Sequence, residues 1–360
     1  MNWRPYILPG LIFQSVIIGG GYATGRELIE FFAPSGPAGG ILGLLVAGVT
    51  FALVLSAAFE FARVFRAYDY RSFARQLLGR AWVLYELGYL ALVVLVLAVV
   101  GAASGELLEA ELGLPPALGT IVMMLLVAWL TFGGSGAISR ALSYWSVLLY
   151  VVYVLLFIAA FVRGGEQIQG NISGGGAHAS WVLPGIRYAS YNIILPAVLF
   201  CMPLLETRRQ ALGAGALAGV IAVVPALLFF VAMLSRYPQI VKEPVPVLYL
   251  MAWLDTGWLV VLFQIVVFGT FVETGAGMLH AINERVEVQV RERGRRLPRW
   301  ARPVIAGCFL LLSVYGATTV GIVDLIAKGY GFLSWWFIAV LLIPLLTVGV
   351  WRIGRSRSGS

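Results

Sequence analysis

The sequence predicts an all-α integral membrane protein with about ten transmembrane helices. Three observations support this fold class: 60% of the 360 residues are hydrophobic, the mean hydropathy is +0.91, and only 12% of the residues are charged. Soluble domains average about 25% charged residues. The net charge of +8 does not indicate nucleic-acid binding, because the basic residues lie mainly in short loops between apolar segments.

Ten apolar segments are each long enough to cross a bilayer, which takes about 20 residues. Basic residues gather in alternate loops, at 63–80, 208–209, 285–302 and 352–357. Because positive loops stay inside, these loops and both termini are expected to be cytoplasmic. The segments are 6–33, 37–61, 82–104, 114–133, 139–162, 183–205, 211–235, 257–283, 300–319 and 331–351.

Glycines interrupt the first apolar segment, within the run GGGYATGRE at Gly19–Glu27. Each glycine costs a helix about 1 kcal/mol relative to alanine, and each backbone group freed in a bilayer needs a partner. An interrupted membrane segment therefore predicts a binding site for a solute or an ion. Close helix packing is an alternative reason for the glycines, but it leaves the two charged residues in an apolar segment unexplained. The candidate substrate-binding residues here are Gly20, Gly21, Tyr22, Thr24 and Gly25.

A second interruption is predicted in the sixth segment, just before Pro196. Proline removes a backbone donor and clashes with the preceding turn, so the helix is expected to kink or open there. Ser190, Tyr191 and Asn192 place polar groups at this opening, and we assign them to the same substrate site. The alternative is a simple proline kink in which Asn192 bonds a neighbouring helix.

The two interrupted segments are the first and the sixth of ten, which are corresponding positions in two halves of five. Because five is odd, the second half enters the membrane from the opposite side. Paired interrupted segments in two inverted halves indicate the central site of a secondary transporter. We therefore predict one transmembrane domain over residues 1–355, with repeats at 6–163 and 183–352 and a tail at 356–360.

The eighth segment carries Thr270, Glu273 and Thr274 at positions i, i+3 and i+4. These positions share one helix face, so two hydroxyls and a carboxylate converge. A carboxylate there can ligate Na⁺, or it can carry a coupled proton because burial disfavours its charged form. We favour the proton. The alternative is a structural ion pair of Glu273 with Arg26 or Arg140.

Arg26 and Glu27 are adjacent, so on a helix they face different directions and need not pair. Arg26 can hold an anionic substrate group bidentately, or it can brace a gate against Glu30 or Asp324. We prefer the gate, and we assign Arg26, Glu27, Glu30 and Asp324 to it. Asp324 and Lys328 are four positions apart, a spacing that allows an ion pair along one helix.

Several runs of the sequence resemble a known family. They are Gly19–Glu27, Tyr188–Asn192, Glu273–Gly275 with His280–Arg285, and Ala327–Gly331. They resemble the YkvI family of bacterial membrane proteins, which is placed in the amino acid–polyamine–organocation (APC) superfamily. Members of that superfamily have the LeuT-type fold. The resemblance spans nearly the whole chain, and it implies a 5+5 inverted repeat with discontinuous helices 1 and 6, in a bacterial plasma (inner) membrane.

The resemblance also implies a location for the coupling ion. The LeuT-type fold typically has a sodium site between the break in the first segment and the eighth helix. Backbone carbonyls near Gly19 and Tyr22 would then complete a site with Thr270, Glu273 and Thr274. The sequence departs from the sodium-coupled pattern by placing Glu273 where a hydroxyl is usual, so both Na⁺ and H⁺ are kept as coupling ions.

These observations predict a secondary active transporter of a small, amino-acid-like organic solute, working by alternating access. A transport-dead solute sensor and an intramembrane lipid-modifying enzyme are the alternatives. We expect no enzyme, because the two histidines and two cysteines have no clustered or metal-ligand spacing, and no ATPase, because a P-loop motif is absent. The expected partners are a small-molecule substrate and the lipid bilayer, with no cofactor beyond the coupling ion and no nucleic acid.

Overall fold

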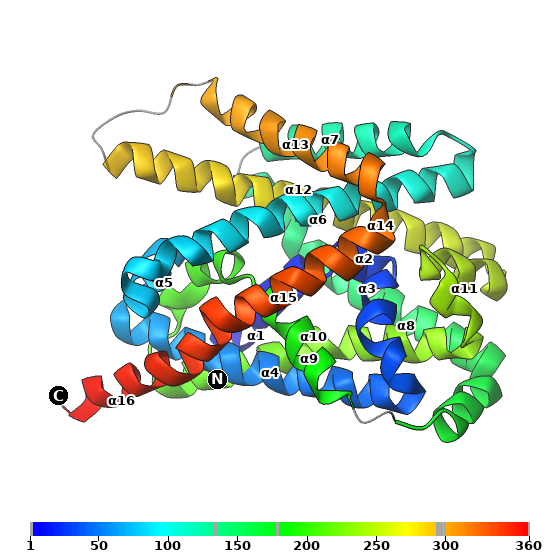
Figure 1. The fold of residues 1–360 in the computed structure, drawn as a ribbon, viewed down its shortest axis with the longest axis horizontal. Helices are drawn as coiled ribbons and strands as arrows, with labels where there is room; N and C mark the ends of the chain where they lie inside the picture. Colours follow the sequence, from blue (N-terminus) through cyan, green and yellow to red (C-terminus); the bar gives the residue numbers. More distant parts are fainter. Residues whose placement is uncertain (1–2, 133–134, 178–179, 293–297, 299, 359–360) are drawn as a thin grey trace.

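The structure, a computed structural model, describes residues 3–132, 135–177, 180–292, 298 and 300–358 (Figure 1). Every regular element in these ranges is helical, and the ten predicted apolar segments coincide with helical chain. In the same ranges, seven helices are long and apolar enough to span a membrane, and one further apolar helix, Pro116–Thr131, is shorter. The chain is an all-helical membrane protein.

The first predicted segment is divided into three helices: α1 (Arg4–Ile17), α2 (Gly20–Ala23) and α3 (Arg26–Phe32). The second break falls at Gly25, whose φ of 81° is in the left-handed region that favours glycine. A Cβ on Gly25 would also lie 2.8 Å from Met233 Sδ. The interruption predicted from the glycine run is therefore present, and it consists of two breaks around a single turn.

The sixth segment also opens. Its elements are α9 (Val182–Asn192) and two short 3-10 helices, η3 (Leu195–Ala197) and η4 (Leu199–Leu204). The helix ends before Pro196, as predicted, and the chain resumes in 3-10 rather than α geometry. Pro196 and Pro203 explain this, because each removes a donor that an α-helix would need.

The other elements follow the predicted order. The long helices are α4 (Gly36–Phe65), α6 (Trp82–Leu112), α7 (Pro116–Phe132), α8 (Ser135–Gly174), α10 (Arg208–Met233), α12 (Gly257–Glu292) and α13 (Ala301–Val320). The connecting elements are η1 (Ala33–Ser35), α5 (Tyr70–Leu78), η2 (Gly79–Ala81), η5 (Leu234–Arg236), η6 (Gln239–Lys242) and α11 (Pro246–Leu254). The sequence predicts short helices within 65–78 and 243–255, and α5 and α11 lie in these two stretches.

The tenth segment is one long helical run that contains three π-helical stretches. Its elements are α14 (Ile322–Asp324), η7 (Leu325–Tyr330), α15 (Gly331–Phe337), η8 (Ile338–Leu342), η9 (Leu345–Gly349) and α16 (Val350–Ser358), of which η7, η8 and η9 are π-helical. The last helix therefore continues into the residues predicted as a tail.

One stretch predicted as a flexible loop is helical. The Gly- and Ser-rich composition of 164–183 predicts a loop, but α8 continues to Gly174, with a kink at Gly164. Asn171 Nδ2 donates a 2.8 Å hydrogen bond to the Leu234 carbonyl, and Ile168 is buried. These contacts outweigh the low helix propensity of the glycines.

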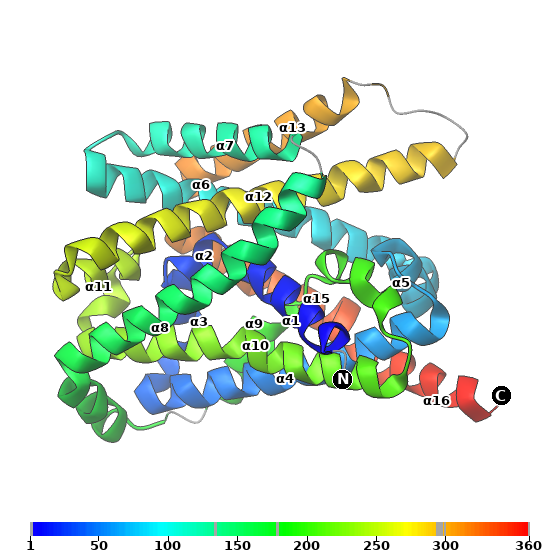
Figure 2. The same cartoon turned by 180° about the vertical axis from the view of Figure 1, so that it is seen from behind.

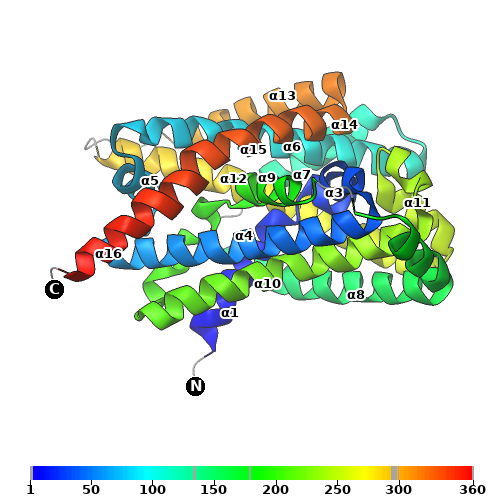
Figure 3. The ribbon, with the colours of Figure 1, turned by 60° about the horizontal axis from the view of Figure 1, so that its bottom comes forward.

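Two groups of helices lie on either side of the breaks. In the first group α10 packs along α1 and α4, and α4 packs along α9; in the second, α6 packs on α7 and α13, and α12 packs on α7. Figures 1 and 2 show the second group above the first, with α2 and α3 between them. Both termini and α5 lie towards the same end of the molecule (Figure 3).

Helices α4 and α10 approach to backbone contact. A Cβ on Gly215 would lie 2.3 Å from the Ser56 backbone nitrogen, so only glycine allows this approach. Ser56 Oγ donates to the Leu212 carbonyl at 3.0 Å.

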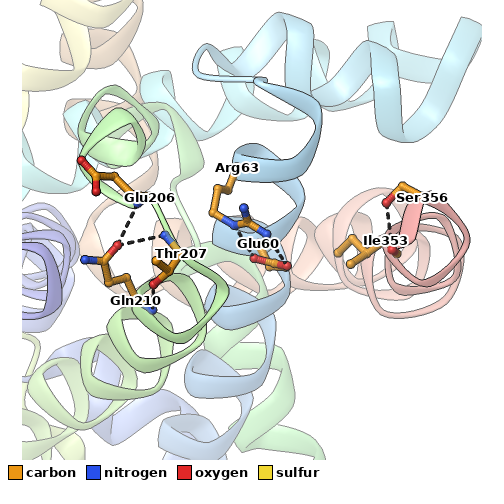
Figure 4. A network of polar contacts seen from close by, with 7 residues as sticks. All are labelled: Glu60, Arg63, Glu206, Thr207, Gln210, Ile353 and Ser356. Atoms are coloured by element: carbon orange, nitrogen blue, oxygen red, sulfur yellow. Dashed lines mark hydrogen bonds and ion pairs between the residues drawn. The ribbon is translucent and has the colours of Figure 1, made fainter. Parts of the chain in front are cut away.

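A capping box between Thr207 and Gln210 begins α10 (Figure 4), and it satisfies backbone groups that the first turn leaves free.

Candidate functional site

A small cavity lies where the two broken segments meet. Gly19 and Glu27 line it from the first segment, Asn192 and Ile194 from the sixth, and further walls come from α6, α12 and η7. Its volume is about 10 Å³, which is room for about one water molecule. The site is therefore closed in this conformation, and any larger solute requires the surrounding helices to move.

Glu27 joins the two broken segments across this cavity. Its Oε1 accepts a 2.6 Å hydrogen bond from Tyr191 Oη and a 3.1 Å hydrogen bond from Asn192 Nδ2. Asn192 Nδ2 also donates to the Tyr188 carbonyl at 3.0 Å, and only 3% of Glu27 is exposed. The sequence assigned Glu27 to a gate, whereas the structure places it beside two of the predicted substrate residues.

Aromatic rings form one side of the site. Tyr191 stacks on Tyr330 with 4.8 Å between ring centroids and 24° between ring planes, and its ring lies 5.5 Å from that of Phe31. Both tyrosines line the cavity. Sequence reasoning missed Tyr330 as a site residue, although Tyr330 lies between two glycines in the run Ala327–Gly331 that resembles the YkvI family.

The other predicted substrate residues build the walls rather than line the cavity. Gly21 lies against Glu27, because a Cβ there would come within 2.6 Å of Glu27 Oε2. Thr24 Oγ1 donates to the Gly21 carbonyl at 2.9 Å, which holds the turn of α2. Ser190 Oγ lies 2.8 Å from the Ser334 carbonyl, to which it can donate. Gly20 begins α2, and Gly25 lies in the second break.

The predicted ion-binding face lies next to the first break. A Cβ on Gly19 would lie 3.4 Å from Thr274 Cγ2 and 4.0 Å from Thr274 Oγ1. The Thr274 hydroxyl, both carboxyl oxygens of Glu273 and the Tyr22 hydroxyl are buried and have no hydrogen-bond partner within the described part of the chain. Such buried oxygens are costly unless something binds them, so Glu273 and Thr274, which are adjacent on α12, fit an ion or proton site.

Thr270 differs from its two neighbours on that face. Its hydroxyl donates to the Val266 carbonyl at 2.7 Å and accepts from Trp145 Nε1 at 3.1 Å. The helix face predicted from the i, i+3, i+4 spacing is therefore present, but its first hydroxyl is already engaged within the protein.

Arg26 points away from the cavity. Its Nη2 lies 2.6 Å from Glu30 Oε2, and its Nη1 donates to the carbonyls of Val241 and Glu243 at 3.0 and 3.2 Å. Arg26 thus ties α3 to the segment that contains η6, and Glu30 is the ion partner that the structure gives it. It makes no ion pair with Glu273.

Two further predicted contacts can be placed. Asp324 Oδ2 lies 2.9 Å from Lys328 Nζ, and both side chains are exposed. Asp324 therefore pairs along its own helix and not with Arg26. The side chain of Arg140, the other predicted partner of Glu273, lies outside the described residues.

The chain is similar to a curated bacterial protein. It is 23% identical over 342 residues to the membrane protein YkvI of Bacillus subtilis (strain 168), covering 92% of this chain and 93% of that protein. No protein-family model matches the chain. The resemblance expected from the motifs is therefore confirmed at the level of the whole chain.

Solved transporter structures share the fold. A Na⁺-coupled sialic acid symporter in a substrate-bound outward-open state gives a TM-score of 0.68 at 11% identity, covering 94% of this chain and 78% of that one. MhsT in complex with L-phenylalanine gives 0.64 at 14%, covering 98% of both chains. A manganese transporter of Eremococcus coleocola gives 0.60 at 16%, covering 94% of this chain and 78% of that one. The chain is a homologue of YkvI, and it has the fold of LeuT-type transporters.

Proposed function

We propose that the protein is a secondary active transporter that moves a small, amino-acid-like organic solute by alternating access. The observation that carries this proposal is the cavity between the two broken segments, bounded by Gly19 and Glu27 on one side and Asn192 on the other. Loose backbone at paired breaks is where secondary transporters bind their substrates. The fold supports the same conclusion, because it is shared with a Na⁺-coupled sialic acid symporter, with MhsT and with a manganese transporter.

The proposal includes ten membrane crossings arranged as two inverted repeats, 6–163 and 183–352. Helix contacts that occur in reciprocal pairs support this arrangement. The first segment packs on the seventh as the sixth packs on the second (α1 on α10, α9 on α4), and the third packs on the ninth as the eighth packs on the fourth (α6 on α13, α12 on α7). Exchanging each segment for the one at the same position in the other half converts one contact of a pair into the other.

The membrane orientation is part of the proposal. We place both termini in the cytoplasm of a bacterium, with the chain in the inner membrane. Support comes from the position of both termini and of α5 towards one end of the molecule (Figure 3). Arg71 and Arg75 lie on α5, so a basic surface helix shares that end, as the positive-inside rule requires.

For the coupling ion, we propose a site formed by Gly19, Tyr22, Glu273 and Thr274, with Thr270 supporting it from one turn away. Thr274 faces the first break, and the buried oxygens of Glu273 and Thr274 are free to bind. A carboxylate with a hydroxyl and backbone carbonyls suits Na⁺, which takes hard oxygen ligands. The same buried carboxyl can instead carry H⁺, since burial favours its neutral form.

The experiment that tests the proposal starts with ligand-induced thermal stabilisation of the purified protein. Amino acids, amines and small carboxylates are screened at two pH values, with Na⁺ or choline as the cation. A ligand that binds only the folded state raises its apparent stability. Each ligand that stabilises the protein is then followed as flux into proteoliposomes under an imposed Na⁺ or H⁺ gradient.

We expect gradient-driven flux that is lost in the variants Glu273→Gln and Thr274→Ala. Loss of a Na⁺ response in Thr274→Ala identifies sodium coupling, and loss of a pH-gradient response in Glu273→Gln identifies proton coupling. Binding without flux under either gradient would contradict transport and would indicate a solute sensor instead.

A further inference from the structure

Among the described residues that line the cavity, Glu27 supplies the one carboxyl group, and the structure holds it in a fixed position. Tyr191 and Asn192 both donate to Oε1, at 2.6 and 3.1 Å. Oε2 lies over Gly21, where a Cβ would come within 2.6 Å of it. The glycine therefore makes room for Oε2 beside α2, while the other oxygen is bound by neutral donors.

The structure gives Glu27 no cationic partner within the described residues. Its neighbour Arg26 is bound to Glu30 and to two backbone carbonyls. Arg187, on the other broken segment, donates to Ser334 Oγ at 3.0 Å and to the Gly331 carbonyl at 3.2 Å. A buried carboxylate without a counter-charge is costly, so the site favours a ligand that supplies one.

The walls of the cavity suit an ammonium group. Tyr191 and Tyr330 lie beside the carboxylate, and their stacked rings line the cavity. Aromatic faces attract organic cations, and a carboxylate with an aromatic wall is a common way to bind them. The remaining lining side chains of the described chain are apolar, apart from Asn192, and none of them carries a positive charge.

We infer that the central site recognises a small organic amine through its positively charged nitrogen, which is bound by Glu27 Oε2 beside the rings of Tyr191 and Tyr330. This inference rests on the proposed function, because it takes the cavity to be the substrate site. It specifies that, of the two charged groups of an amino-acid-like solute, the site binds the amine. Since the lining has no cationic side chain to meet a carboxylate, a monocationic amine binds better than the zwitterion of the same carbon length.

The test uses solutes that are matched in carbon length and differ in charge. n-Propylamine, β-alanine, propionate and n-propanol share a three-carbon chain and are cationic, zwitterionic, anionic and neutral near pH 7. Longer amines and their amino-acid counterparts extend the series in size. Affinity for each solute is measured by thermal stabilisation and by calorimetry, for the wild type and for Glu27→Gln. Glutamine keeps a carbonyl oxygen that can accept from Tyr191 and Asn192, so this variant removes the charge while preserving the shape.

Within the series we expect amines to bind most tightly, and Glu27→Gln to weaken them by about tenfold to a hundredfold, the usual range for a hydrogen bond to a charged group. The control Glu106→Gln changes a half-buried carboxyl on α6, away from the cavity, and should leave amine binding unchanged. If Glu27→Gln fails to fold, Tyr330→Leu, which removes one aromatic face, should weaken amines more than n-propanol.

Three outcomes would overturn the inference. They are tighter binding of propionate or β-alanine than of the amine, amine affinity that survives Glu27→Gln, and no stabilisation by any amine in the series. None of these outcomes removes the proposed transport function, which is tested separately by gradient-driven flux of whichever solute binds. Loss of that flux together with intact, Glu27-dependent amine binding would instead contradict transport and leave the assignment of the amine site standing.

Discussion

Gly19 and Thr274 lie face to face across the first break, so that a Cβ on the glycine would come within 3.4 Å of the threonine methyl group. This contact brings unwound backbone next to a buried hydroxyl that has no hydrogen-bond partner within the described residues. The coupling-ion site that we propose would use both groups, the backbone carbonyl on one side of this contact and the hydroxyl on the other.

The first prediction concerns that hydroxyl. Thr274→Val removes it while keeping the shape of the side chain, so the fold should be as stable as the wild type or slightly more stable, because a buried unpaired polar group is lost. The stabilisation that Na⁺ gives the wild type should disappear, as measured by thermal unfolding at graded Na⁺ concentrations.

A matched control is Thr120→Val. Thr120 is equally buried, but its Oγ1 donates to the Gly101 carbonyl at 2.9 Å. Its loss should cost about 1 kcal/mol and leave the response to Na⁺ intact. A Na⁺ response that persists in Thr274→Val, in a protein whose wild type shows one, would contradict the proposed ion site.

The second prediction concerns the hydrogen bond between Tyr191 and Glu27. Tyr191→Phe keeps the ring stacked on Tyr330 but removes the 2.6 Å hydrogen bond. The free energy of unfolding should fall by about 1.5 to 3 kcal/mol, as for other hydrogen bonds to charged groups. Tyr153→Phe is the control, because the Tyr153 hydroxyl has no partner within the described chain. Equal effects of the two variants would show that the Tyr191 hydroxyl is not bonded to the carboxylate.

The third prediction concerns the contact between α4 and α10. Gly215→Ala places a Cβ 2.3 Å from the Ser56 backbone nitrogen, so the helices must separate and the apparent melting temperature should fall by several degrees. Gly307→Ala, on α13, meets nothing within 4 Å and should be neutral or stabilising, because alanine is the better helix former by about 1 kcal/mol. A similar melting temperature for both variants would contradict the close approach.

The fourth prediction compares two ion pairs. Arg26→Ala removes a guanidinium that binds Glu30 and two backbone carbonyls in a largely buried position, so it should destabilise the protein strongly. Lys328→Ala breaks a pair whose side chains are 77% and 47% exposed, which should cost no more than about 1 kcal/mol. The two melting curves, measured in the same detergent, check the ranking, and a larger loss for Lys328→Ala would reverse it.

The sequence predicted the order of the ten helical segments and both interruptions, because apolar length, glycine and proline act locally. It could not place Glu27. The direction of that side chain depends on the turn at Gly25, whose φ of 81° rotates α3 relative to α1. The two adjacent charges were expected to face different directions, but the orientation of α3 decides which surroundings each one reaches, with Arg26 near η6 and Glu27 in the cavity.

Two other differences between the predicted and the observed structure also arise from features that the local sequence does not encode. Tyr330 reaches the cavity through a π-helical stretch, which changes the register of side chains relative to the expected α-helix. Residues 165–174 are helical because Asn171 is bonded to the Leu234 carbonyl, a contact between segments far apart in the sequence. Local pattern reasoning contains no information on such tertiary contacts.

The glycine-mediated contact between α4 and α10 has a mechanical consequence. Two helices in backbone contact cannot slide or separate without breaking that contact. We therefore expect α4 and α10 to move together as a rigid body when the closed cavity opens. The flexible joints are then the unwound residues at Ile18–Gly19 and Ile193–Ile194. Distances measured by spectroscopy between labels on α4 and α10 should therefore stay constant when the cavity opens, while distances between labels on α10 and α12 should take two values.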